Sequence, residues 1–134
     1  MAQPHTFLHP RGWKLAKGFS NGVVAEGRMI FLAGQVGWNA EQRFESGDFV
    51  AQARQALANV VTLVAEAGGG AEHITRLTWF VLDKKDYLSR LRELGEAYRG
   101  VMGKHFPAMT LIQVGALVED EAKVEIEATA VVPT

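Results

Sequence analysis

Apolar and polar residues alternate strictly along the last part of the chain. Residues 124, 126, 128, 130 and 132 are apolar, whereas the positions between them begin with Glu125 and Glu127. A period of two is typical of a strand with one dry and one polar face. The apolar segment 109–114 predicts another strand, and the acidic residues 119–121 predict a turn. We therefore expect a closing hairpin.

Two further apolar segments, 19–25 and 29–36, lie on either side of a short polar stretch and predict a first hairpin. Residues 29–33 are continuously apolar, which indicates a strand covered on both faces. Gly34 within this strand indicates a bulge. A short extended piece is expected at 43–45.

A long strand is predicted at 74–82, with Leu77, Trp79 and Val81 on one face. Between residues 49 and 64 apolar residues recur at three- and four-residue steps, which predicts an amphipathic helix. Asp48 is suited to its N-cap, and Gly68 to the left-handed position after its end.

A second helix is predicted to begin at Asp83 or Asp86 and to end before Pro107, which cannot continue it. Its apolar stripe runs through Tyr87, Leu91, Leu94, Tyr98, Val101 and Met102. Each predicted helix thus has one dry face, and both can cover the same side of a sheet.

The predicted order is β-β-β-α-β-α-β-β. It indicates an α+β two-layer sandwich, in which a mixed six-stranded sheet carries two helices on one face. Residues 1–18 have no apolar period and are expected to be an extended N-terminal lead-in, so that residues 19–134 form a single domain. The other sheet face would be half apolar and uncovered, which predicts an oligomer.

Composition narrows the function classes. The chain of 134 residues has a net charge of −1, without the basic surplus that nucleic-acid binding requires. Cysteine is absent, so disulfides and thiolate chemistry are excluded. The sequence shows neither a signal peptide nor an apolar run long enough for a membrane span, and we expect a cytoplasmic location without membrane contact.

Motifs for metals and cofactors are missing from the sequence. The four histidines are scattered without ligand spacing, and we expect surface or terminal positions and no metal. The glycine clusters at 18–22 and 68–70 lack a phosphate-binding context, so no cofactor is expected. Glu125 and Glu127 share one strand face. They could be solvated surface residues or, at a dry interface, one could be a general base.

Several segments resemble the RidA/YjgF family of imine and enamine deaminases, formerly labelled endoribonuclease L-PSP. They cover residues 19–132 in the family's order and spacing. These segments are FSNG (19–22), MIFLAGQV (29–36), QARQALANV (52–60), AG (67–68), ITRLTWFVLD (74–83), FPA (106–108) and VEIEA (124–128). The resemblance implies a chorismate-mutase-like fold and a homotrimer with three clefts between subunits.

Active members of that family add water to 2-aminoacrylate-type intermediates and release ammonia. Their arginine after the Pro-Ala pair clamps the substrate carboxylate, and this position is Met109 here. The resemblance also implies that Phe19 replaces a tyrosine, and that Ala33, just before Gly34-Gln35, replaces a serine. Only the glutamate that orients water is kept, as Glu125. The chain is therefore identified as a divergent member that lacks the clamping arginine.

The changed positions leave two functions open. One is a hydrolase that deaminates an imine or enamine, with Glu125 as the catalytic residue. The candidate substrate-binding residues are Phe19, Ala33, Gln35, Trp38, Arg92 and Met109. Arg92 could be a substitute for the lost charge or an ordinary surface arginine, and Trp38 and Trp79 suggest an aromatic cleft. The other function is a non-catalytic metabolite-binding or protein-interaction module of the same fold.

Overall fold

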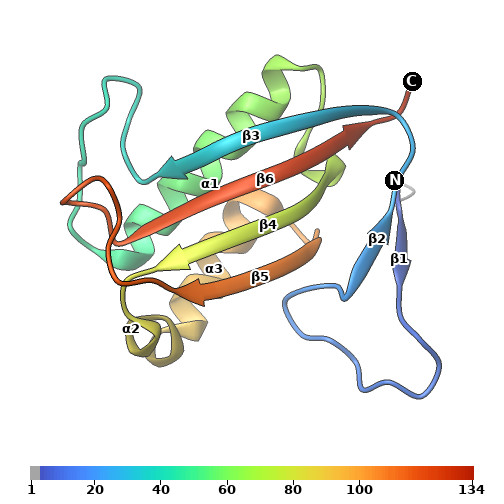
Figure 1. Ribbon diagram of the computed structural model, residues 1–134, viewed down its shortest axis with the longest axis horizontal. Helices are drawn as coiled ribbons and strands as arrows, with labels where there is room; N and C mark the ends of the chain where they lie inside the picture. The colour runs from blue at the N-terminus through green and yellow to red at the C-terminus, as the bar shows by residue number, and fades with distance from the viewer. Residues whose placement is uncertain (1–3) are drawn as a thin grey trace.

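The computed structural model describes residues 4–134. The chain contains both helices and strands, as Figure 1 shows. The elements are β1 (Thr6–Leu8), β2 (Gly22–Val24), β3 (Arg28–Val36), α1 (Phe49–Glu66), the 3-10 turn η1 (Ala71–His73), β4 (Ile74–Val81), α2 (Lys84–Ser89), α3 (Leu91–Met102), β5 (Ala108–Gln113) and β6 (Val124–Val132).

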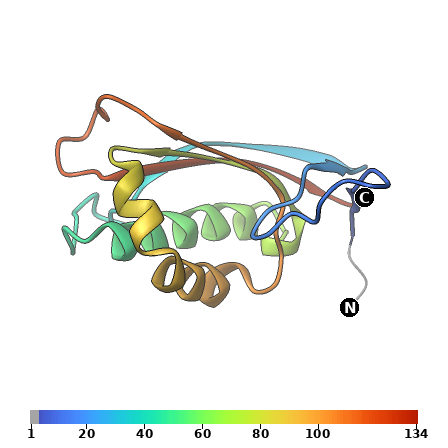
Figure 2. The same ribbon diagram turned by 90° about the horizontal axis from the view of Figure 1, so that it is seen from below.

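The main sheet has four strands in the order β3-β6-β4-β5, with β4 and β5 parallel and the other pairs antiparallel. The helices lie on one face of this sheet, as Figure 2 shows from the side. The predicted α+β two-layer architecture is therefore confirmed. The six strands are divided, however, because β1 and β2 form a separate two-stranded sheet.

Both predicted hairpins are wrong in their pairing. Strand β2 pairs with β1 rather than β3, and β6 lies between β3 and β4 while β5 pairs with β4. A period of two fixes which face of a strand is dry, but it does not select the neighbouring strand. The long connection from β5 to β6 allows β6 to cross to the sheet centre, where both of its edges find hydrogen-bond partners.

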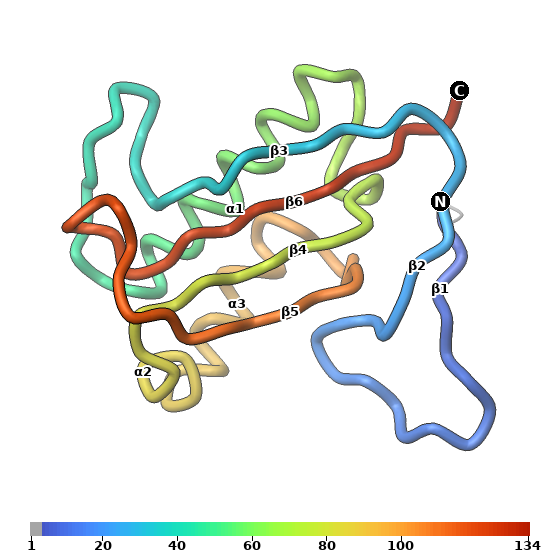
Figure 3. Tube along the Cα trace, viewed as in Figure 1, coloured from blue at the N-terminus to red at the C-terminus, as the bar shows by residue number. Residues whose placement is uncertain are grey.

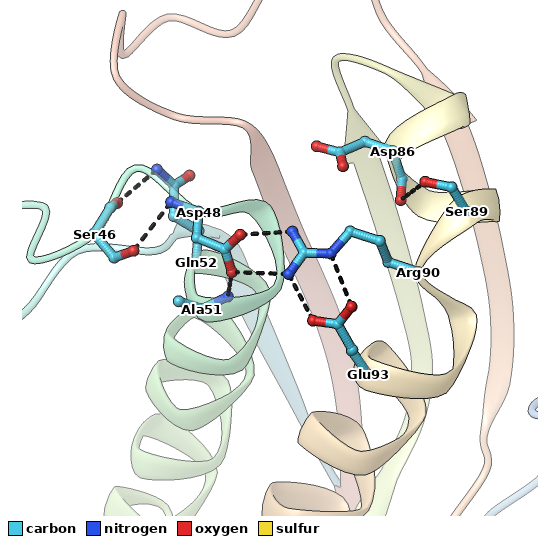
Figure 4. A network of polar contacts seen from close by, with 8 residues as sticks. All are labelled: Ser46, Asp48, Ala51, Gln52, Asp86, Ser89, Arg90 and Glu93. Atoms are coloured by element: carbon cyan, nitrogen blue, oxygen red, sulfur yellow. Dashed lines mark hydrogen bonds and ion pairs between the residues drawn. The ribbon is translucent and has the colours of Figure 1, made fainter.

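The first helix begins at Asp48 as predicted, since the Asp48 side chain accepts a hydrogen bond from Ala51 N at 3.0 Å. It ends at Glu66 with Ala67 as its C-cap, and Gly68 follows in the predicted left-handed conformation, with φ of 89°. The second predicted helix is split into α2 and α3 at Arg90, which leaves helical geometry. Figure 4 shows the Arg90 guanidinium between Asp48 and Glu93, joining this corner to the start of α1.

The two faces of the main sheet differ in their environment. The face toward the helices forms the core, with Leu77, Trp79 and Ile126 all buried. On the opposite face Met29 and Phe31 of β3 are 60% and 73% exposed. The predicted uncovered face is thus present in the single chain, whereas the prediction that residues 29–33 are covered on both faces is wrong for one copy.

The N-terminal segment is more structured than its composition indicates. Residues 6–8 form β1, and the chain then passes through a long loop before β2 (Figure 3). The predicted extended piece at 43–45 is no strand, but Phe44 forms an isolated bridge with Trp38. His5 and His105 are buried. The prediction that the histidines are at the surface or near the terminus is therefore wrong for His105, whereas His5 is near the N-terminus.

Candidate functional site

Glu125 lies on the open face of the sheet, beside a bulge in β3. The register between β3 and β6 shifts between Leu32 and Gln35, which confirms the bulge predicted at Gly34. A side chain at residue 34 would place its Cβ 2.8 Å from the Glu125 Cδ atom. The glycine therefore leaves the space that the Glu125 carboxylate occupies. Phe80 of β4 faces Glu125 from the other side.

Gln52 holds the loop that leads into β6 and so helps to position Glu125. Its Nε2 donates to the carbonyl oxygens of Ser46 and Glu121 at 3.0 and 2.9 Å, and its Oε1 accepts from Lys123 N at 2.8 Å. Gln52 is only 1% exposed. Gln52 is not among the predicted site residues, although a glutamine one helical turn from the apolar Phe49 indicates a buried polar side chain that needs hydrogen-bond partners.

Met109 lies on the opposite side of the sheet from Glu125. It is paired in register with the buried Leu77 of β4, so its side chain is on the helix-facing surface. There it lines a cavity of about 330 Å³ between β4, β5, α2 and α3. One chain therefore does not bring Met109 and Glu125 together, and a site that uses both needs a second copy.

The cavity beside Met109 is mainly apolar. Leu94, Leu111 and Trp79 contribute to its walls, together with Phe106. Phe106 stacks on Tyr98 with ring centroids 5.3 Å apart. Burial raises the pKa of the Tyr98 hydroxyl, which stays protonated and donates to the carbonyl oxygen of His105 at 2.7 Å.

The remaining predicted site residues are dispersed. Phe19 is 40% exposed and borders a shallow hollow of the N-terminal loop, and Ala33 is exposed at the bulge. The Gln35 Nε2 donates back to the Ala33 carbonyl at 3.1 Å. Trp38 packs against Phe44, with ring centroids 5.8 Å apart, outside the Met109 cavity.

Arg92 does not reach the cavity. Its side chain is 93% exposed and its nearest charged partner is Glu96, one helical turn away at 3.7 Å. The cavity lining instead includes Arg99 and, from the N-terminal loop, Lys17. The two positively charged residues that line the cavity, Arg99 and Lys17, are thus not among the predicted site residues.

The buried histidines make backbone contacts. His5 Nε2 lies 3.1 Å from the carbonyl oxygen of His73, and His105 Nε2 lies 2.7 Å from that of Ile74. Burial lowers the pKa of His105, which favours its neutral form. Within residues 4–134 no three His, Asp or Glu side chains gather in an arrangement suited to a metal ion. In the same range no helix is both long and apolar enough to cross a bilayer.

The chain is similar in sequence to a known protein family and to several of its members. The family model described as Endoribonuclease L-PSP matches residues 13–132. The chain is 36% identical over 108 residues to the 2-iminobutanoate/2-iminopropanoate deaminase of Escherichia coli K12, covering 78% of this chain and 80% of the relative. It is also 35% identical over 109 residues to a RutC family protein of Pasteurella multocida, covering 81% and 84%.

Solved structures agree with this family relationship. A conserved Rid family protein of unknown function from Yersinia pestis superposes with a TM-score of 0.86 at 30% identity, covering 96% of this chain and 99% of that protein. The YjgF protein of Escherichia coli gives a TM-score of 0.66 at 35% identity, covering 84% and 87%. Because the family model spans most of the chain and these relatives share its fold, the chain belongs to the RidA/YjgF family.

Proposed function

We propose that this protein is a hydrolase that deaminates a small imine or enamine, with Glu125 as the catalytic residue. The observation that carries this proposal is the Glu125 carboxylate lying over Gly34 at the β3 bulge, on a sheet face open to a ligand or a second copy. Support also comes from the deaminase of Escherichia coli, which is named for 2-imino acids.

The reaction needs a positioned water molecule and one group that can move a proton. An enamine first tautomerises to the imine. Glu125 accepts a proton from the water as its oxygen adds to the carbon of the C=N bond, and returns this proton to the nitrogen, which becomes an amine. Transfer of the hydroxyl proton of this adduct to the nitrogen, again through Glu125, forms the C=O bond as the C–N bond breaks. Ammonia and a carbonyl compound leave, so one water is consumed and no oxidant or cofactor is required.

The proposed site is shared between copies in a homotrimer. Met109 and Glu125 lie on opposite sides of the sheet of one chain, so a ligand that contacts both must lie between two copies. Strand β5 is the edge strand of the sheet and contributes Met109 to the cavity. The cavity therefore lies at the same edge of the molecule at which the open sheet face ends. The exposed Met29 and Phe31 supply an apolar surface for the assembly.

Activity on 2-aminoacrylate is expected to be weak. Met109 occupies the position of the family's carboxylate-clamping arginine, and a thioether cannot make a bidentate contact with a carboxylate. Phe19 and Ala33 have lost polar groups as well. These three apolar positions favour the second candidate function, in which the protein binds a metabolite or a protein without catalysis.

Ammonia release distinguishes the two candidates. We expect the chain to release ammonia from imines generated in the assay, and Glu125→Gln to lower kcat about a hundredfold, because the amide cannot accept the proton. Glu127→Gln is the matched control, since Glu127 is on the same face of β6 but exposed. Equal ammonia release by the native chain and Glu125→Gln would leave only the non-catalytic function.

A further inference from the structure

The loop between β1 and β2 is fastened to the rest of the chain at Ser20. The Ser20 N donates to the carbonyl oxygen of Pro107 at 3.0 Å, and the Ser20 Oγ donates to that of Phe106 at 2.5 Å. Ser20 also forms an isolated parallel bridge with Ala108 at the start of β5. Phe106 lines the cavity beside Met109. Ser20 therefore holds the loop against one wall of this cavity.

Residues 9–19 of this loop, here called the strap, are loosely attached. All of them except Ala16 are exposed. Within residues 4–134 the strap forms a single hydrogen bond, from Trp13 N to the carbonyl oxygen of Pro10, and both residues belong to the strap itself. A hollow of about 430 Å³ is lined only by residues between 13 and 21. The strap thus encloses space instead of packing on the domain, and Figure 3 shows it as the long loop that joins β1 to β2.

Two glycines give the strap places to bend. Gly12 and Gly18 have φ of 87° and 77°, a conformation that residues with a side chain rarely adopt. An added Cβ would meet nothing within 4 Å at either position, so the backbone conformation and not a lack of space favours glycine there. Lys17 and Gly18 line the cavity. Rotation at these glycines therefore moves part of the cavity wall.

Charge opposes the position that the strap has in the structure. Its lysines and its arginine are Lys14, Lys17 and Arg11, and in the part of the chain that the structure describes none of them forms an ion pair. Lys17 shares the lining of the cavity with Arg99. Two positive charges at one cavity repel each other. The hydrogen bonds of Ser20 offset this repulsion and keep the strap over the cavity.

We propose that the strap is a gate over the Met109 cavity, which is closed when Ser20 is bonded to Phe106 and Pro107 and opens when these bonds break. Ser20 is a positioning residue, since it acts through the strap. In the closed state Lys17 and Gly18 complete the cavity wall, and in the open state a small molecule enters or leaves. The inference concerns access to the cavity, and only its link to turnover rests on the proposed deaminase function.

A single thiol inside the cavity measures how often the strap opens. The chain contains no cysteine, and Leu94 of α3 lines the cavity although it is only 5% exposed. The rate at which iodoacetamide alkylates Leu94→Cys therefore reports access to the cavity. Adding Ser20→Ala should raise this rate about fivefold, because the closed strap loses the Ser20 Oγ hydrogen bond. Ser20→Thr, which keeps a hydroxyl, should retain the slow rate.

A second thiol separates opening of the strap from loosening of the whole domain. Val64 of α1 is fully buried and lies outside the cavity lining. Alkylation of Val64→Cys should not change when Ser20→Ala is added. Equal rates for Leu94→Cys with and without Ser20→Ala would overturn the proposal, and so would an equal acceleration at both thiols.

Gly18→Ala tests the gate if Ser20→Ala fails to fold. A methyl group at the positive φ of residue 18 strains the closed strap, and it should also speed the alkylation of Leu94→Cys about fivefold. Gly68→Ala is the matched control, since Gly68 has a φ of 89° but lies outside the cavity lining, and it should leave the rate unchanged. The same rate in Gly18→Ala and Gly68→Ala would contradict the gate.

The proposed deaminase function is judged separately, because alkylation requires no turnover. In ammonia release, Ser20→Ala is expected to raise KM about fivefold and to change kcat by less than about twofold, since Glu125 is untouched. Alkylation that depends on Ser20 without any ammonia release would reject the deaminase function alone. Alkylation that is independent of Ser20, together with Glu125-dependent ammonia release, would reject the gate alone.

Discussion

At the scale of single residues, the candidate site depends on small residues as much as on charged ones. Gly34 leaves room for the Glu125 carboxylate, and Gly95 leaves room for the Arg99 guanidinium. Gln52 adds a polar contribution, because its buried side chain forms hydrogen bonds with three backbone groups, of Ser46, Glu121 and Lys123. The two glycines leave space for a charged side chain, and Gln52 holds the loop that precedes Glu125.

Gly34→Ala should impair catalysis without unfolding the protein. Its new methyl group would meet Cγ and Cδ of Glu125 within 2.9 Å, which forces the carboxylate away from the bulge. A displacement of this kind is expected to lower kcat by up to about a hundredfold, measured as ammonia release. Gly47→Ala is the control, since nothing lies within 4 Å of its new Cβ. If Gly34→Ala is fully active, the position of Glu125 is not important for catalysis.

At the scale of elements, the N-terminal strand is attached to the domain through buried histidines. His5 contacts the carbonyl oxygen of His73, and Phe7 of β1 packs against His105 with ring centroids 5.8 Å apart. The pKa of His105 is lowered chiefly by burial and further by His5, while its bond to Ile74 O and the charge of Glu72 oppose this shift. The attachment of β1 is therefore expected to weaken in acid.

The pH dependence follows from the direction of the His105 shift. Below the unfolded pKa of about 6.5 the unfolded chain binds a proton that the folded chain does not, so stability falls as the pH decreases toward the lowered pKa. We expect His105→Gln to lose less unfolding free energy than the native chain between pH 8 and pH 5, by about 1 kcal/mol in urea titrations. His9→Gln, at an exposed position, should follow the native chain. Parallel curves for native and His105→Gln chains would contradict this assignment.

At the scale of the whole molecule, one face of the sheet has no cover from its own chain. Phe31, Met29 and Ile112 are 73%, 60% and 44% exposed on strands β3 and β5. Water contact with so much apolar surface is unfavourable, which is why we propose an assembly through this face. The same assembly would bring Glu125 of one copy toward the cavity of another.

Phe31→Asp should dissociate this assembly, because a charge buried at an apolar interface is strongly unfavourable. In sedimentation experiments we expect the native chain to be a trimer and Phe31→Asp to be a folded monomer with little ammonia release. Leu63→Asp, at an exposed apolar position on α1, should remain trimeric. A native monomer, or a trimeric Phe31→Asp, would exclude this face as the interface.

The sequence by itself determined the types of the main elements and the faces of the strands. Alternation in β6 predicted the dry side correctly, and Asp48 and Gly68 predicted the ends of α1. Gly34 predicted the bulge. These features follow from backbone preferences and from the period of the side chains, which act within a few residues of the chain.

Only the tertiary structure decided which strands are neighbours and which site residues meet. Strand β6 lies between β3 and β4 because hydrogen bonding between distant segments sets strand order, and this pairing leaves no local signal. The register of the paired strands places Glu125 and Met109 on opposite sides of the sheet. The orientation of α3 decides which of its arginines lines the cavity, and this is Arg99 and not Arg92.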